Sequence, residues 1–198
     1  MSSVRQTEPV YRAVVIGASA GGLEALQDVL GALDTDFKLP IAVVQHLSPT
    51  SDGYLVKYLD EHCRIHIKEA DEKDVLTPGT VYLAPANYHM LVEENGTLSL
   101  SVDSRVCFSR PSVDVLFETA ARAFNKGLIA VILTGGNEDG SQGLAAVHRA
   151  GGLTIVQAPE TAAAAEMPRA ALAATQVDHV LPLNEIGPFL SRLAANHG

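Results

Sequence analysis

Continuous apolar runs alternate along this chain with stretches in which apolar residues recur every three or four positions. The clearest runs cover residues 12–17, 40–46, 128–133 and 153–157, and they are rich in valine and isoleucine. Such runs are typical of strands covered on both faces of a parallel sheet. The sequence therefore predicts a doubly wound α/β fold, with a mostly parallel sheet and helices on both faces.

Helical periodicity separates most of the runs. Leu23, Leu26, Leu30 and Leu33, for example, share one face of a helix. Helices are expected over residues 22–33, 51–62, 112–126, 141–150 and 185–196, with a short one inside 160–175; shorter strands are expected at 64–69, 80–84 and 179–181.

One region breaks the alternation of strands and helices. Residues 88–93 and 97–102 flank Glu94-Asn95-Gly96, and Asn-Gly between strand-like runs is a strong hairpin signal. We expect an antiparallel β-hairpin excursion there. The polar residues 1–11 are expected to be a disordered lead-in, and residues 12–196 to form one domain.

Charge and composition narrow the class of partner. The 198 residues carry a formal net charge of −9, which argues against nucleic acid and anionic membrane surfaces. We see no signal peptide and no apolar run long enough to span a bilayer, so a cytoplasmic protein without membrane insertion is expected. Cys63 and Cys107 form no metal-binding or redox pattern and are interpreted as simple thiols.

The first strand leads into a candidate nucleophile. Gly17-Ala18-Ser19-Ala20-Gly21 fits G-x-S-x-G, the elbow that presents a serine between a strand and a helix. Ser19 is therefore a candidate nucleophile. The Ala20 amide, next to a helix N-terminus, is a candidate oxyanion donor.

Polar residues also follow two other buried strands. His46 ends the second run, and the turn at 134–140, which contains Asp139, follows the run at 128–133. Ligands of parallel sheets bind beyond the carboxyl ends of the strands, so Ser19, His46 and Asp139 should converge. His46 would take the proton of Ser19, and Asp139 would orient the imidazole.

Each residue of this triad also has a structural interpretation. Ser19 could cap the first helix, His46 could be a hydrogen-bonded loop histidine, and Asp139 could cap the helix at Ser141. The rival acids are Glu138, Asp52 and Asp114, although Asp114 better suits the first turn of its own helix; His89 is the alternative base.

A dinucleotide site is the main competing interpretation, because a glycine turn after a first strand can hold a pyrophosphate. However, Ser19 stands where G-x-G-x-x-G requires its second glycine. The second strand ends in Gln45 and His46, without the acid that would bind a ribose.

Several blocks together resemble the CheB-type chemotaxis methylesterases from about residue 12 to 190. The blocks are Gly17 to Gly22, Gln45-His46, Ala84-Pro85 with His89, Arg110-Pro111-Ser112-Val113-Asp114, Leu133-Thr134-Gly135 with Asp139-Gly140, and Met167-Pro168. The resemblance implies hydrolysis of glutamate γ-methyl esters, and often deamidation of glutamines, on the cytoplasmic helices of chemoreceptors or similar signalling proteins.

The resemblance also implies a Ser-His-Asp triad, which maps onto Ser19, His46 and Asp139, and a reaction without cofactor or metal. His89, Gly136 and Met167 are candidates for binding the substrate.

Three departures from the family pattern stand out. Gly136-Asn137 replaces the usual Met-Gly, and Glu166 replaces the glycine before Met167. Family members typically begin with a receiver domain, which this sequence is expected to lack, so control by phosphorylation within the chain is not expected. The first departure motivates an alternative function, a catalytically weakened docking module that binds receptors or signalling proteins.

Overall fold

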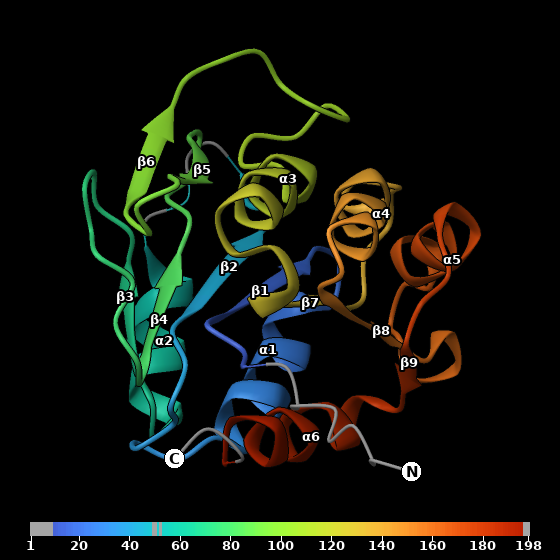
Figure 1. The fold of residues 1–198 in the computed structure, drawn as a ribbon, viewed down its shortest axis with the longest axis horizontal. Helices are drawn as coiled ribbons and strands as arrows, with labels where there is room; N and C mark the ends of the chain where they lie inside the picture. Colours follow the sequence, from blue (N-terminus) through green and yellow to red (C-terminus); the bar gives the residue numbers. More distant parts are fainter. Residues whose placement is uncertain (1–9, 49–50, 52, 196–198) are drawn as a thin grey trace, which may run out of the picture.

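A seven-stranded parallel sheet forms the centre of the protein. The computed structural model describes residues 10–48, 51 and 53–195. The strand order is β3-β4-β2-β1-β7-β8-β9, and every neighbouring pair is parallel (Figure 1). The strands are β1 (Ala13–Ala18), β2 (Ile41–Gln45), β3 (His66–Glu69), β4 (Thr80–Leu83), β7 (Leu128–Ile132), β8 (Leu153–Gln157) and β9 (His179–Leu181).

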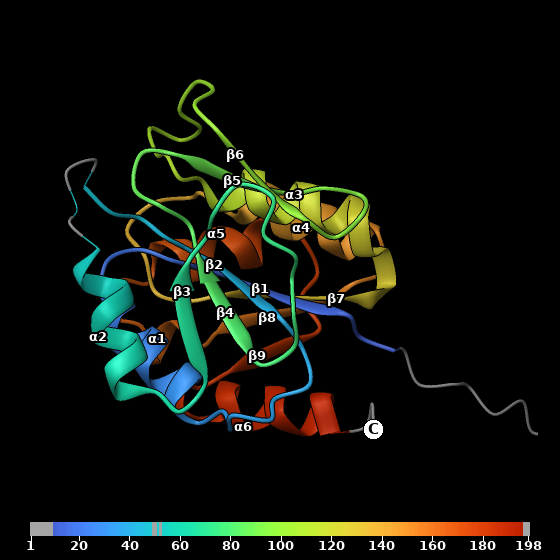
Figure 2. The same ribbon diagram turned by 90° about the vertical axis from the view of Figure 1, so that its left-hand side faces the viewer.

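Helices cover both faces of the sheet (Figures 1 and 2). One face packs against α1 (Gly22–Gly31), α2 (Tyr54–His62) and α6 (Leu183–Ala195), and the other against α3 (Val113–Phe124), α4 (Ser141–Arg149) and α5 (Glu166–Ala174). Alternation along β1 feeds both cores, because Val14 and Ile16 join the first layer whereas Ala13 and Val15 join the second. The predicted doubly wound fold is confirmed.

The expected hairpin forms a separate two-stranded antiparallel sheet. It consists of β5 (His89–Val92) and β6 (Leu98–Ser101), and the Glu93 amide closes it by donating to the Thr97 carbonyl at 2.8 Å. The hairpin packs on α3, where the Val92 amide donates to the Thr119 hydroxyl at 3.1 Å (Figure 1).

Some predicted boundaries move. Helix α2 begins at Tyr54 rather than residue 51, since Gly53 adopts a left-handed N-cap with φ of 78°. Helix α6 begins two residues early, at Leu183. Residues 112–126 divide into α3 and a 3-10 turn, Asn125–Gly127, and a second 3-10 turn, Pro159–Thr161, precedes α5. Most of the expected lead-in, residues 1–9, lies outside the described residues.

The order in which the chain adds strands to the sheet changes sides at β1. From β1 the chain first forms β2, β3 and β4 on one side, and it later returns to place β7 on the other side of β1. Helices α1 and α4, which follow these two central strands, lie on opposite faces. A crevice is expected where the order reverses, at the carboxyl ends of these strands. No described helix has the length and apolar character needed to cross a membrane.

Candidate active site

The turn after β1 holds Ser19 by its backbone. The Ser19 amide donates to the Thr134 carbonyl at 2.9 Å, and the Ser19 carbonyl accepts from the Gln45 side chain and from the Gly22 amide, both at 2.8 Å. A Cβ atom on Gly22 would collide with the Gln45 carboxamide, so this approach of β2 to the turn requires glycine. The turn is fixed from both neighbouring strand ends, and the Ser19 hydroxyl makes no hydrogen bond within the described part of the chain.

The Ala20 amide follows Ser19 at the tip of this turn. It has no acceptor among the described residues, and Ala20 itself is exposed. Gly21, with φ of 75°, is the N-cap of α1, so Ser19 does not cap that helix. The Ala20 amide is therefore available to a negatively charged oxygen at the start of α1.

His46 extends from the end of β2 toward the end of β7. Its amide donates to the Ala18 carbonyl at 3.0 Å, which fixes its backbone beside β1. Its ring is mostly enclosed, with 12 % of the side chain exposed, and Nε2 lies 2.7 Å from Oδ2 of Asp139. The ring nitrogen that does not face Asp139 is therefore Nδ1. The structure brings His46 and Asp139 together and sets no hydrogen bond between His46 and the Ser19 hydroxyl.

The Asp139 carboxylate is buried against the beginning of α3. It accepts hydrogen bonds from the Ser112 hydroxyl (2.8 Å), the Val113 amide (2.8 Å) and the Asp114 amide (3.0 Å), in addition to its contact with His46. Two of these donors are the first amides of a helix, whose partial positive charge favours an anion. Asp139 therefore caps α3 rather than α4, whose N-cap is Gly140.

Several forces act on the charge of Asp139. Burial, the largest of them, would raise the pKa of this carboxyl group. The hydrogen bond to His46 and those from the Asp114 and Val113 amides act in the other direction, and together they lower the pKa of Asp139 below its ordinary value. Asp139 is thus an anion at neutral pH, so Nε2 of His46 carries a proton and donates it to Oδ2.

Gly135, just after the end of β7, forms a wall of the site close to Ser19. A Cβ atom on Gly135 would lie 3.0 Å from the Cβ of Ser19 and would collide with the sulfur of Met167. The Met167 amide donates to the Gly135 carbonyl at 2.9 Å, and its side chain is buried. Met167 therefore supports the wall from behind, while Gly136 is exposed at the surface.

Both the sequence and the fold of this chain are similar to those of known proteins. Residues 14–190 match the family described as CheB methylesterase. The chain belongs to this family. The crystal structure of the Thermotoga maritima CheB methylesterase catalytic domain has a TM-score of 0.88 and 34 % sequence identity, covering 92 % of this chain and 98 % of that chain.

Curated CheB relatives differ in length. A protein-glutamate methylesterase/protein-glutamine glutaminase of Anaeromyxobacter dehalogenans is 40 % identical over 185 residues, which are 92 % of this chain and 51 % of that protein. A Leptospira interrogans protein, which bears this activity name provisionally, is 51 % identical over 187 residues, covering 94 % of this chain and 97 % of its own.

The alternative base and the alternative acids that the sequence offered have other positions or other partners. His89 is buried, and its Nε2 lies 3.0 Å from the Ser104 carbonyl, so in this conformation its ring is closed to a substrate. Glu138 is exposed, and Asp114 lies in the first turn of α3. Asp52 lies outside the described residues.

Residues that position the triad were missed by sequence reasoning. Ser112 is the N-cap of α3, where its hydroxyl accepts from the Val115 amide at 3.5 Å, and the same hydroxyl donates to Asp139. Gln45 stands where a dinucleotide fold would need an acid, and it instead donates to the Ser19 and His46 carbonyls. The adjacency of Ser112 to a helix start was the available signal, because helix starts attract carboxylates.

A group of metal-ligand atoms overlaps with this site. The sulfur of Cys107 and carboxylate oxygens of Asp114 and Asp139 lie within 4.8 Å of one another. Burial and the neighbouring carboxylates, foremost Asp139, raise the pKa of the Cys107 thiol, which therefore stays protonated. Asp139 already accepts four hydrogen bonds from the protein, so its carboxylate is committed to His46 and the start of α3 rather than to a metal ion.

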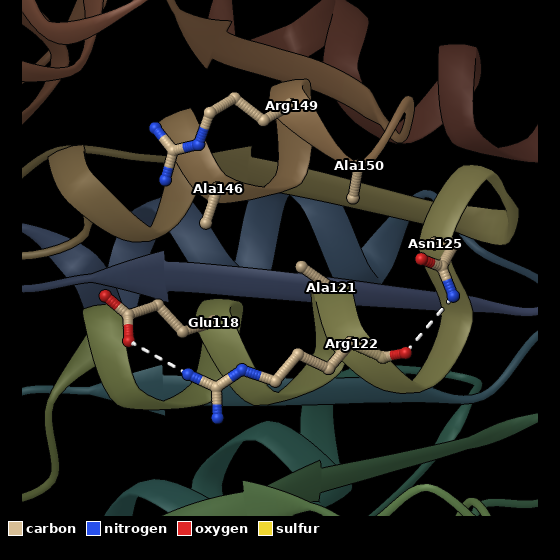
Figure 3. A pocket seen from close by; sticks show the side chains of 7 residues that line it. All are labelled: Glu118, Ala121, Arg122, Asn125, Ala146, Arg149 and Ala150. Carbon is tan, nitrogen blue, oxygen red and sulfur yellow. Dashed lines mark hydrogen bonds and ion pairs between the residues drawn. The ribbon is translucent and has the colours of Figure 1, made fainter.

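A hollow of about 440 Å³ lies between α3 and α4, away from the triad. Figure 3 shows small alanine side chains between the two helices, with Arg122 on one side and Arg149 on the other. Arg122 pairs with Glu118 at 3.7 Å. Because Arg122 lies nine residues after Val113, it is about 14 Å along the helix from the Asp139 end. This hollow has no nucleophile and is not part of the candidate active site.

Proposed function

We propose that this chain is a protein-glutamate methylesterase, with residues 12–196 as its catalytic domain and Ser19, His46 and Asp139 as its triad. Its substrates would be glutamate γ-methyl esters on the cytoplasmic helices of chemoreceptors or similar signalling proteins. The observation that best supports this proposal is the 2.7 Å contact between His46 and Asp139 beside a serine elbow. Membership in the CheB methylesterase family supports the reaction type.

The first half of the reaction forms an acyl-enzyme. Nδ1 of His46 removes the proton of the Ser19 hydroxyl as its oxygen attacks the ester carbonyl carbon, since a serine alcohol is a weak nucleophile at neutral pH. Asp139 stabilises the imidazolium that forms. The Ala20 amide donates to the carbonyl oxygen as it becomes negative. The imidazolium then protonates the departing methoxide, and methanol leaves.

The second half regenerates the enzyme. His46 takes a proton from a water molecule that attacks the acyl carbon, and it returns this proton to the Ser19 oxygen as the ester bond to the enzyme breaks. The product is a glutamate side chain. With a glutamine substrate the same steps release ammonia in place of methanol, which would give glutaminase activity without another residue.

The site offers all these groups from the chain itself, so the reaction needs no cofactor. Chemoreceptor helices that carry such esters are cytoplasmic, and a cytoplasmic location for the enzyme follows from this choice of substrate. The acidic chain, with a net charge of −9, does not favour nucleic acid as a partner.

The decisive experiment measures methanol release from a methylated receptor fragment. Wild type should release methanol well above background, and Ser19→Ala should lose at least about a thousandfold in rate. Because the Ser19 hydroxyl makes no hydrogen bond within the described residues, this variant should unfold at the wild-type temperature.

Two results would count against the proposal. Absence of methanol release by wild type, with receptor binding retained, would favour the docking-module alternative. Full activity of Ser19→Ala would instead reject the triad assignment while leaving an esterase in place.

A further inference from the structure

The side chain of Phe108 is unusually exposed for an aromatic residue. It is 94 % accessible, more than any other large apolar side chain among the described residues. It sits in a tight turn, residues 106–109, in which the Val106 and Ser109 backbones exchange hydrogen bonds of 3.1 and 2.8 Å. Aromatic side chains, phenylalanine among them, are enriched where proteins bind one another.

The backbone of this turn, here called the Phe108 turn, adopts an unfavourable conformation. Cys107 and Phe108 have φ of 46° and 62°, a region that glycine and asparagine tolerate far better. Neither residue is typical of such a turn. A conformation of this kind is retained where the surrounding structure enforces it, and it is common at ligand-binding positions.

Arg110 fixes the base of the turn to the hairpin region. Its guanidinium donates to the Val102 carbonyl at 2.5 Å and to the Asp103 carbonyl at 2.9 Å. It also donates to the side chain of Asn87 at 2.8 and 3.3 Å. Four hydrogen bonds from one side chain hold the segment, so Phe108 is presented from a rigid support, and little entropy is lost when it binds.

Phe108 lies between two hollows that border the candidate active site. A small one, of about 80 Å³, is lined by His46, Arg105 and Phe108. A larger one, of about 550 Å³, is lined by Phe108 together with Gly136, Asn137, Glu166 and Arg169. The candidate base, His46, lines the first hollow. The second is lined by the residues that directly follow Gly135, and Gly135 itself lies close to Ser19.

We propose that Phe108 is the apolar anchor for the substrate segment that flanks the glutamyl ester. This inference rests on the proposed function and identifies how that site holds its substrate. An esterified residue that reaches Ser19 must bring its neighbouring residues over the two hollows beside His46. On a helix, side chains three or four positions apart share a face, so an apolar neighbour of the ester can pack against the Phe108 ring.

The position of the ring favours a substrate segment over a second copy of the chain. One hollow beside Phe108 is lined by His46 of the candidate triad, and the other by Gly136, which follows the wall residue Gly135, so an occupant of either would lie over the site during the reaction. A permanent homodimer through Phe108 would block this opening. Aromatic anchors next to pockets are also the residues that contribute most to protein recognition.

The test compares a protein substrate with a small ester. Phe108→Gly removes the ring and relaxes the positive φ, so the turn is preserved or stabilised. We expect about a tenfold rise in KM for a methylated receptor fragment, corresponding to partial loss of one buried aromatic contact. Hydrolysis of p-nitrophenyl acetate, which has no flanking segment, should stay at the wild-type rate.

Two further variants separate anchoring from folding. Phe108→Leu keeps an apolar side chain and should retain a KM near that of wild type. Val180→Ala removes another exposed apolar side chain, 45 % accessible on the edge strand β9, and should leave both activities unchanged.

Three results would overturn the anchor. One is an unchanged KM of Phe108→Gly for the receptor fragment, with wild type active. Another is an equal loss of small-ester hydrolysis, which would indicate that the turn only supports His46. The third is sedimentation that shows a wild-type dimer and a monomeric Phe108→Gly. If wild type released no methanol from any receptor, the proposed function would fail first, and the anchor with it.

Discussion

The carboxylate of Asp114 accepts a hydrogen bond of 2.6 Å from the Gly143 amide, and this contact joins the first turns of α3 and α4. The helices approach so closely that a Cβ atom on Gly143 would lie 2.6 Å from the Cβ of Phe117. Burial is the largest influence on the pKa of Asp114, the Gly143 hydrogen bond opposes it, and the charge of Asp139 adds to it; together they raise this pKa to about 6. The joint beside the candidate triad therefore contains a carboxyl group whose ionisation is unfavourable in the folded protein.

Asp114→Asn should make the protein more stable at pH 7.5. Since the folded-state pKa of Asp114, about 6, exceeds its ordinary value of 3.8, the folded protein binds more protons between these values. The free energy of unfolding therefore falls as pH rises through this window. Asparagine keeps an acceptor for Gly143 without a charge, so urea unfolding should give about 1–3 kcal/mol of added stability at pH 7.5 and little at pH 4. A loss of stability that is equal at both pH values would contradict this explanation.

Asp139 should contribute to stability with the opposite sign. Its folded-state pKa is lowered, so its contribution is present above its ordinary value of 3.8 and is lost as pH falls through the folded-state value. Asp139→Ala should be destabilised by about 2–4 kcal/mol at pH 7, because buried donors on Ser112, Val113 and Asp114 lose their acceptor. Acid titration followed by circular dichroism should show a shallower dependence below pH 4 than in wild type.

Ser112→Ala should affect both stability and turnover. Loss of its cap on α3 should cost about 0.5–2 kcal/mol, and loss of its bond to Asp139 should lower kcat by about tenfold with KM unchanged. Ser141→Ala is the matched control, since Ser141 is also a buried serine at the start of a helix but makes no bond to Asp139. Equal kcat losses in both variants would show that the effect is not transmitted through Asp139.

Gly135→Ala should impair the site through crowding. The added methyl group would collide with the Met167 sulfur and lie 3.0 Å from the Cβ of Ser19, so the wall or the nucleophile must move. Because a displacement of about 1 Å can lower a reaction rate a hundredfold, we expect kcat for methanol release to fall by ten- to a hundredfold.

Gly31→Ala is the control, because its added atom meets nothing within 4 Å. Its higher helix propensity should add about 0.5–1 kcal/mol of stability and leave kcat unchanged. Normal turnover of Gly135→Ala would contradict the crowding argument.

The sequence was most informative where burial decides structure. Continuous apolar runs identified β1, β2 and β7, and the rule that parallel strands end at one edge brought His46 to Asp139. It could not identify the ring nitrogen involved, because Nε2 or Nδ1 is selected by packing. It also did not link Ser112 to Asp139, since that contact depends on how α3 docks.

The Phe108 turn was missed for a different reason. Sequence prediction of two-residue hairpins relies on asparagine and glycine, as at Asn95-Gly96, whereas Cys107 and Phe108 carry no such signal. The start of α2 was misjudged similarly, because Ser51 is a typical cap but Gly53 takes that position. Local propensity fails at these places because tertiary contacts determine the backbone.

The contact between His46 and Asp139 spans 93 positions of the chain. During synthesis, the serine turn and His46 emerge well before Asp139 and the strand that carries it. At the usual pace of translation, about 5–20 residues per second, roughly 5–20 s separate the two residues. A growing chain therefore cannot assemble the candidate triad until β7 has joined β1, and under the proposed function esterase activity would mark the point at which the second half of the sheet has been made and folded.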